Sequence, residues 1–137
     1  MALAIIVTVE KEISELADYL KAKPGKALAR ELEKIDFAAR CVKATQMSEM
    51  ISESQAALAE QMRESGMDPT KMRLPPEMWY PAGDGLKAVR ALIEYVSGHL
   101  NDFKQPNPIL RDLKAAEALL AAAEAAGARF HFAKANL

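Results

Sequence analysis

Two histidines and a few polar neighbours are the residues of this chain whose types could do chemistry. His99 and Asp102 lie three positions apart, so on a helix they would share one face and could supply two ligands to a metal ion. No cluster of cysteine or further histidine completes such a ligand shell, and a histidine near a helix end is also favoured as a solvated cation. We therefore predict a polar helix surface here, with no metal and no cofactor.

His131 is the second candidate. It lies between Phe130 and Phe132, so on a strand its ring points away from the face of the two phenylalanines. A general base would need an acid or a nucleophile nearby, which the sequence does not place. We interpret His131 as a hydrogen-bonded structural residue. The lone Cys41 is expected on the inward side of a helix, where a buried thiol is usually inert. No catalytic residue is predicted.

An anion site is conceivable where a helix is expected to begin, at Gly83-Asp84-Gly85. Free backbone N–H groups at a helix start bind phosphate or carboxylate. Asp84, however, is a good N-cap whose side chain would occupy the same donors and add a negative charge. The further glycines and preceding strand of a nucleotide fingerprint are missing. An ordinary capped helix is the preferred interpretation.

The most unusual stretch is Met72 to Leu86, which contains three of the seven prolines, two of the six glycines and the only tryptophan. Loops of this length in compact domains usually serve a purpose. Methionine and tryptophan are frequent at adaptable binding surfaces, so the large side chains of this region could form an apolar patch: Met67, Met72, Leu74, Met78, Trp79 and Tyr80. The alternative is a loop that folds back and uses Trp79 as a plug over the helices.

Composition limits the classes of partner. Eighteen basic and nineteen acidic residues give a net charge of -1, without the basic cluster that nucleic acids or anionic membranes require. A single cysteine suits a reducing compartment, which predicts a cytoplasmic location. The apolar run from Ala2 to Val9 lacks the features of a signal peptide and is too short to span a bilayer.

A strand is expected at the N-terminus. All residues from Ile5 to Val9 are β-branched, a composition that loses rotamer freedom in a helix and packs well on a sheet. Helical spacing also fits, so a single helix over residues 2–22 is the competing interpretation. A helix is expected from Lys11, closed by Pro24-Gly25.

Helical periodicity dominates the rest of the chain. One apolar stripe runs from Leu28 to Val42 and an offset stripe from Met47 to Met62, which predicts two helices with a break at residues 41–46. Two long helices follow, from Asp84 to Phe103 and from Asn107 to Ala126. The inward positions predicted for the Asp84 helix alternate by three and four residues: Leu86, Val89, Ile93, Val96, Leu100 and Phe103.

The tail from Ala128 to Lys134 alternates phenylalanine with polar residues, which predicts a strand. Its expected partner is the strand Ile5–Val9, with helices covering the apolar face of the pair. The predicted fold is α+β and predominantly α, with about five helices and a short antiparallel pair of terminal strands; an all-α bundle is the alternative. Residues 1–137 are expected to form one domain, with a long loop at about residues 65–84.

Trp79-Tyr80, Gly85-Leu86 and the helix segment Val89-Arg90-Ala91-Leu92 form a recognisable pattern. This pattern resembles that of a family of small uncharacterised bacterial proteins, and the similarity extends over most of the chain. A strand ending in Glu10-Lys11 and the terminal Arg129-Phe130-His131 are similar as well. The resemblance implies a bacterial origin and the two terminal strands, and it brings no catalytic residue.

The leading functional hypothesis is a small cytoplasmic protein that binds another protein, or itself, without catalytic activity, as an accessory, regulatory or immunity-type partner. Its predicted binding residues are Met72, Arg73, Met78, Trp79, Tyr80, Arg90 and His131. The alternative hypothesis is that the chain binds a small molecule or an anion, and one form of this hypothesis makes the chain an enzyme. Its pocket would lie beside the Trp79 to Gly85 loop, with Arg73, Tyr80, Arg90 and His131 as polar groups.

Overall fold

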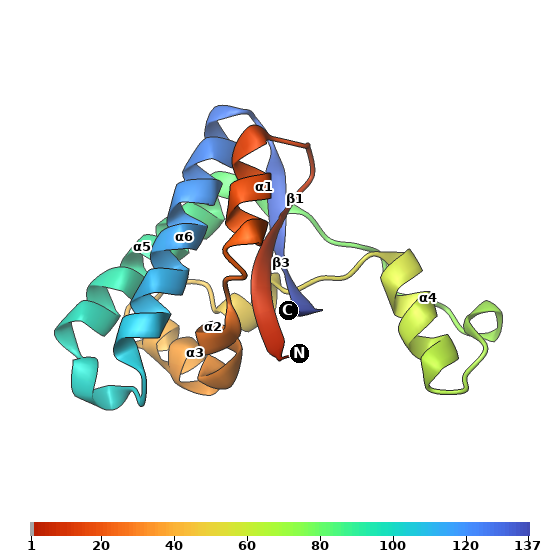
Figure 1. Ribbon diagram of the computed structural model, residues 1–137, viewed down its shortest axis with the longest axis horizontal. Helices are drawn as coiled ribbons and strands as arrows, with labels where there is room; N and C mark the ends of the chain where they lie inside the picture. The colour runs from red at the N-terminus through yellow and green to blue at the C-terminus, as the bar shows by residue number, and fades with distance from the viewer. Residues whose placement is uncertain (1) are drawn as a thin grey trace.

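The computed structural model describes residues 2–137 and shows a helical hairpin packed against a small antiparallel sheet (Figure 1). The sheet contains β1 (Leu3–Val9), β3 (Arg129–Asn136) and β2 (Tyr80–Pro81) in the order β1-β3-β2. The hairpin consists of α5 (Ala82–Gly98) and α6 (Pro106–Ala125). The predicted mainly helical α+β class is confirmed, and the all-α alternative is wrong.

The two terminal strands pair as predicted. Val9 lies opposite Phe130 and Val7 opposite Phe132 in an antiparallel register. These four side chains are buried beneath the helices because alternate residues of a strand share one face. The third strand, β2, was not predicted; it is only two residues long and contains Pro81, which suits a short edge strand.

The outer edge of β1 is covered by the segment that follows it. The Val7 N–H donates to the hydroxyl of Tyr19, at 2.9 Å, in α1 (Ser14–Lys21). The Ile5 N–H donates to the carbonyl of Gly25 at 3.0 Å, and Gly25 has a φ of 95°, which favours glycine. These bonds satisfy strand groups that would otherwise be open to pairing with another chain.

The first apolar stripe forms two helices rather than one. α2 (Lys26–Arg30) and α3 (Leu32–Cys41) are separated at Glu31, whose backbone leaves the helical region. The buried Glu31 carboxylate accepts hydrogen bonds from the N–H groups of Lys104 and Gln105, at 2.7 and 3.1 Å. The predicted break after Cys41 is present, and the chain continues into the 3₁₀ helix η1 (Met47–Met50).

Helix α5 differs from its prediction at both ends. It begins at Ala82, so Asp84 lies in the first turn and is not the N-cap. It ends at Gly98, which leaves Leu100 outside the helix, in the short 3₁₀ turn η3 (Leu100–Asp102), and 44% exposed. Four of the six predicted inward residues are buried, namely Leu86, Val89, Val96 and Phe103. Leu92 is buried in place of Ile93, which is only partly so.

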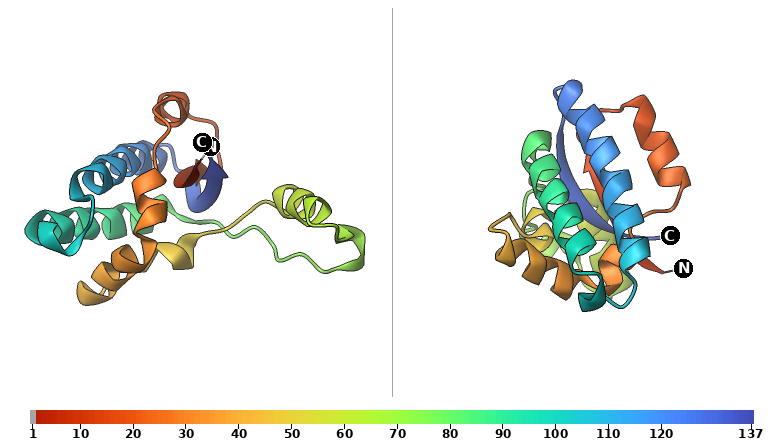
Figure 2. Two further views of the ribbon diagram at one scale, coloured as in Figure 1. Left: turned by 60° about the horizontal axis from the view of Figure 1, so that its bottom comes forward. Right: turned by 90° about the vertical axis from the view of Figure 1, so that its left-hand side faces the viewer.

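Residues 52–79, which we call the arm, project from the body (Figures 1 and 2). The arm contains α4 (Gln55–Glu64) and the 3₁₀ turn η2 (Pro69–Lys71), and α4 has no buried residue. The predicted helix from Met47 to Met62 is therefore interrupted, and the loop expected at residues 65–84 contains η2 and β2 and ends where α5 begins. None of the helices within residues 2–137 has the length and apolar character needed to cross a bilayer.

Candidate functional site

His131 lies at the base of the arm, on the sheet face that points away from α5 and α6. Its ring is 2% exposed, and the Trp79 ring covers it at a centroid distance of 4.5 Å. Nε2 lies 2.6 Å from Oε2 of Glu77, and Nδ1 lies 3.0 Å from the carbonyl oxygen of Phe132. Both ring nitrogens therefore have an oxygen partner. His131 is buried and hydrogen-bonded, as the sequence predicted.

The two ends of the arm are tied to each other and to the sheet. The Ser52 N–H donates to the carbonyl of Phe132 at 2.8 Å, and the Met78 N–H donates to the hydroxyl of Ser52 at 2.8 Å. The Tyr80 hydroxyl donates to the carbonyl of Glu49 at 3.1 Å. Together with the contact between Glu77 and His131, these bonds fix the direction in which the arm leaves the sheet.

The outer part of the arm is shaped by local signals. Ser54 caps α4 by accepting a hydrogen bond from the Ala57 N–H at 3.1 Å. Asp68 accepts bonds from the hydroxyl and the N–H of Thr70 at the start of η2, and these bonds lower the pKa of the Asp68 carboxyl. Such caps need no tertiary partner.

Large apolar side chains of the arm remain uncovered. Met67, Met72 and Met78 are 48%, 54% and 50% exposed. Leu58 and Met62 lie four residues apart on α4 and are only partly buried, so they share one face of that helix. These apolar side chains form a surface that we call the methionine surface: Leu58, Met62, Met67, Met72 and Met78. The arm that carries them contributes no residue to the buried core.

The structure brings together most of the predicted binding residues, but not all of them. Trp79, Tyr80 and His131 form the arm base with Met78, and the exposed Met72 and Arg73 lie in the segment that returns to it. Arg90 is elsewhere: its Nε lies 3.3 Å from Oε2 of Glu117 on α6.

The sheet separates Arg90 from the arm base. A Cβ at Gly85 of α5 would overlap the ring of Phe130, so the phenylalanine face lies against the helices. His131, its neighbour in β3, points to the opposite face. The structure therefore places Arg90 and His131 on opposite sides of the sheet, whereas the small-molecule hypothesis required both residues to line one pocket. Two residues that matter at the arm, Ser52 and Glu77, were not singled out from the sequence. Leu58 was assigned to an apolar stripe, but the helix that carries it has no buried residue.

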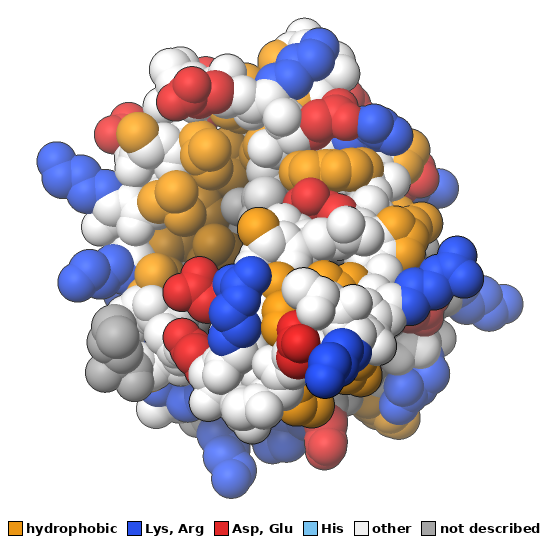
Figure 3. Space-filling view, turned by 90° about the vertical axis from the view of Figure 1, so that its right-hand side faces the viewer, with side chains coloured by type: hydrophobic (Ala, Val, Ile, Leu, Met, Phe, Trp, Pro, Cys, Tyr) orange, Lys and Arg blue, Asp and Glu red, His pale blue; other side chains and the backbone are white. Residues whose placement is uncertain are grey.

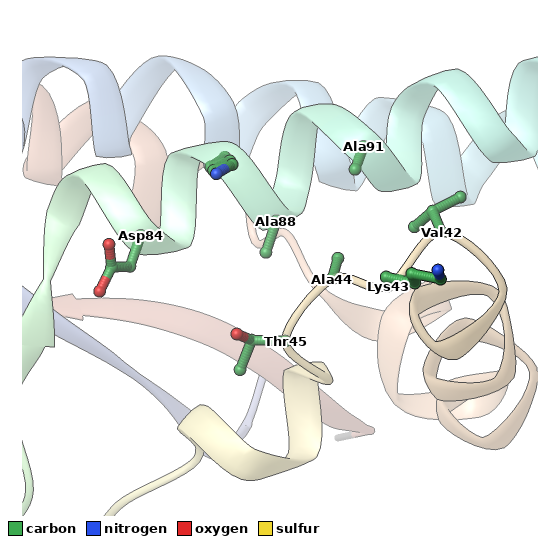
Figure 4. Close-up of a pocket in the computed structure, with 8 residues that line it drawn as sticks. Val42, Lys43, Ala44, Thr45, Asp84, Ala88 and Ala91 are labelled. Atoms are coloured by element: carbon green, nitrogen blue, oxygen red, sulfur yellow. The ribbon is translucent and has the colours of Figure 1, made fainter.

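A groove of about 360 Å³ lies between α5 and the loop that follows α3 (Figure 4). Asp84, Lys87, Ala88 and Ala91 line it from the helix, and residues 42–45 line it from the loop after α3. The charged groups in this lining have opposite signs, because Asp84 is acidic whereas Lys43 and Lys87 are basic.

The remaining sequence candidates have structural explanations. The His99 ring stacks on Tyr95 at 4.0 Å, and its Nδ1 lies 2.8 Å from the Tyr95 carbonyl. Across residues 2–137, no group of three or more His, Cys, Asp or Glu side chains could hold a metal ion. The prediction that Cys41 points inward is wrong: it is exposed at the end of α3, whose buried side is formed by Ile35, Ala38 and Ala39.

No known protein family, curated protein or solved structure matches this chain. The resemblance carried by Trp79-Tyr80 and the following helix thus has no support from these comparisons. The function has to be argued from the geometry of the arm.

Proposed function

We propose that this chain is a small cytoplasmic bacterial protein that acts by binding a protein, in an accessory, regulatory or immunity-type role without catalysis. The arm is its binding surface. The observation that carries this proposal is the exposed methionine surface, which is carried by an arm that projects from the body (Figure 1).

The isolation of α4 supports the proposal. Helices shorter than about 12–15 residues are marginal in water unless tertiary packing covers an apolar face. Helix α4 has ten residues, none of them buried. A protein docked on Leu58, Met62 and the exposed methionines would supply the missing packing, and methionine adapts well to such contacts.

The rigid base supports the proposal as well. A segment held in place before binding loses less conformational entropy when its partner docks. The bonds from Ser52, Met78 and Glu77 anchor both ends of the arm. Trp79 and Tyr80 at this base belong to residue types that are enriched at protein interfaces.

Composition favours a protein partner and a cytoplasmic location. The net charge of -1 provides little attraction for nucleic acid or an anionic membrane. The lone, exposed Cys41 suits a reducing compartment.

Site-specific photo-crosslinking in native host cells tests the proposal. A photoreactive amino acid in place of Met67 should give covalent adducts with a protein. The same group in place of Glu94, exposed on α5, serves as the matched control and should give none. Equal adduct formation at the two sites, or none at either, would show that the arm is not a binding surface.

A further inference from the structure

The sheet has one face that the helices leave open. Because opposite residues in a ladder share a face, the register of β1 and β3 defines it. Ile6, Thr8 and Ala135 on this face are only partly buried. Figure 3 looks at the molecule from the arm side and shows hydrophobic side chains gathered in a hollow next to the arm. We call this face the open sheet face. Its residues are Ala4, Ile6, Thr8, His131, Ala133 and Ala135. Ala4, His131 and Ala133 are buried, so the part that remains accessible is formed by Ile6, Thr8 and Ala135.

The arm leaves the body on the same side as the open sheet face (Figure 1). One end of the arm is bonded to the edge of β3, where the Ser52 N–H donates to the Phe132 carbonyl, and the other end reaches the open sheet face, where Glu77 contacts His131. The exposed methionines of the arm and the accessible residues of the open sheet face therefore lie on the same side of the body.

The following inference rests on the proposed function and names the partner. We propose that the arm binds a second copy of this chain, and that two copies exchange arms reciprocally. The methionine surface of each copy covers the open sheet face of the other. Two such copies are related by a two-fold axis, so the contact closes and uses the same residues twice.

The two surfaces fit each other in shape. The accessible part of the open sheet face includes two small side chains, Thr8 and Ala135. The arm offers long, flexible ones, including Met67 and Met72. Long side chains inserted over small ones give the close packing of a protein interior. A standard interface involves roughly 20 to 30 residues on each side, and the arm alone supplies a number of that size.

Charge also favours a second copy. The arm carries five acidic and three basic residues, so the rest of the chain is slightly basic. An arm is therefore attracted to the body of another copy. The net charge of -1 produces almost no repulsion between two whole copies.

The mass of the protein in solution, measured by sedimentation over a range of concentrations, tests the inference. The wild type should be a dimer. Met72→Glu should raise the dimer dissociation constant by about tenfold or more, since it brings an unpaired carboxylate into the contact. Ala56→Glu adds the same charge at an exposed position on the opposite side of α4 from Leu58 and Met62 and should leave the dimer unchanged.

A mixing experiment tests the reciprocity. Ala135→Glu places the charge on the open sheet face and should give a monomer, as Met72→Glu does. In a pair made of one copy of each variant, the intact arm of the Ala135→Glu copy can cover the intact open sheet face of the Met72→Glu copy. The mixture should form a heterodimer, while each variant alone stays monomeric. Melting temperatures close to that of the wild type would establish that both variants are folded.

A wild type that stays monomeric at every concentration would overturn the inference, and so would a dimer that Met72→Glu leaves intact. The proposed function fails on a different observation, the absence of adducts at Met67. Adducts with a different protein, together with a monomeric wild type, would leave the proposed function standing and remove the second copy as the partner.

Discussion

His131 Nε2 and Glu77 Oε2 lie 2.6 Å apart and join the returning segment of the arm to the central strand of the sheet. The imidazole is buried and the carboxylate is partly exposed. This contact lies beneath Trp79, so the hydrogen-bonded pair and the only tryptophan together close the base of the arm. The direction of the arm therefore depends on a few side chains rather than on a hydrophobic core.

Glu77→Ala should destabilise the protein by about 1 to 3 kcal/mol, because it leaves a buried ring nitrogen of His131 without a partner. Glu77→Gln keeps an oxygen at the same reach and should cost less. Urea titration of the two variants measures the difference. Equal losses would mean that the contact with His131 adds nothing to stability.

Trp79→Ala should destabilise the protein by less than the roughly 3 to 5 kcal/mol lost when a fully buried aromatic residue is truncated. Trp79 is only partly buried, and it covers His131 on the sheet face that points away from the helices, so it does not form the plug over the helices that was the alternative. Thermal unfolding of the monomer at low concentration gives the measurement. A loss in the full range would make Trp79 a core residue and remove it from the binding surface.

The periodicity of the sequence predicts the elements that carry their own pattern. The β-branched run at Ile5 to Val9 and the alternation around Phe130 identify the two long strands and their pairing. The break after Cys41 is visible as a shift between stripes. The isolation of α4 is not visible, because an apolar helical stripe has the same spacing whether it meets a core or a partner.

Buried carboxylates are the second feature that sequence patterns do not predict. Glu31, Asp36 and Asp112 are each less than a tenth exposed. Each accepts a hydrogen bond from a backbone N–H group of another segment, in the case of Asp112 from Ala27, 85 positions away. The fold decides which N–H group each carboxylate meets. In the sequence, these three residues look like any other polar residue between apolar ones.

Asp112→Ala should cost about 1 to 3 kcal/mol, because the Ala27 N–H at the start of α2 would lose its partner. Asp102→Ala removes the same group from an exposed position and should stay within about 0.5 kcal/mol of the wild type. Denaturant titration compares the pair. Similar small effects would show that the hydrogen bond from Ala27 is not needed.

Leu92→Ala should cost about 2 to 5 kcal/mol, the range for truncating a buried aliphatic residue, because Leu92 is 1% exposed in α5. Ile93→Ala should cost less, since Ile93 lies at the margin of the core. Glu94→Ala, on the exposed side, should change stability by no more than about 0.5 kcal/mol. A larger loss at position 93 than at position 92 would restore the helix phase predicted from the sequence.

Tyr19 makes stability depend on alkaline pH. Burial raises the pKa of its hydroxyl, and the negative charge of Asp112 acts in the same direction, while the hydrogen bond from the Val7 N–H opposes them. Because the folded-state pKa is the higher one, the stability that Tyr19 contributes is fully present below its unfolded pKa of about 10. That contribution is lost as the pH rises from there toward the folded-state pKa, at about 1.4 kcal/mol per pH unit.

Tyr19→Phe should therefore lower the free energy of unfolding at neutral pH, by about 1 to 3 kcal/mol, because the Val7 N–H loses its acceptor. The same variant should lose less stability than the wild type when the pH is raised above about 10, since it has no hydroxyl to ionise at this position. Urea titrations at neutral and alkaline pH give the free energy of unfolding of both proteins. The difference between the two free energies cancels the contribution of every other titrating group. A difference that stays constant across this range would mean that the Tyr19 hydroxyl ionises as easily in the folded protein as in the unfolded chain, and that the edge of β1 is open to water.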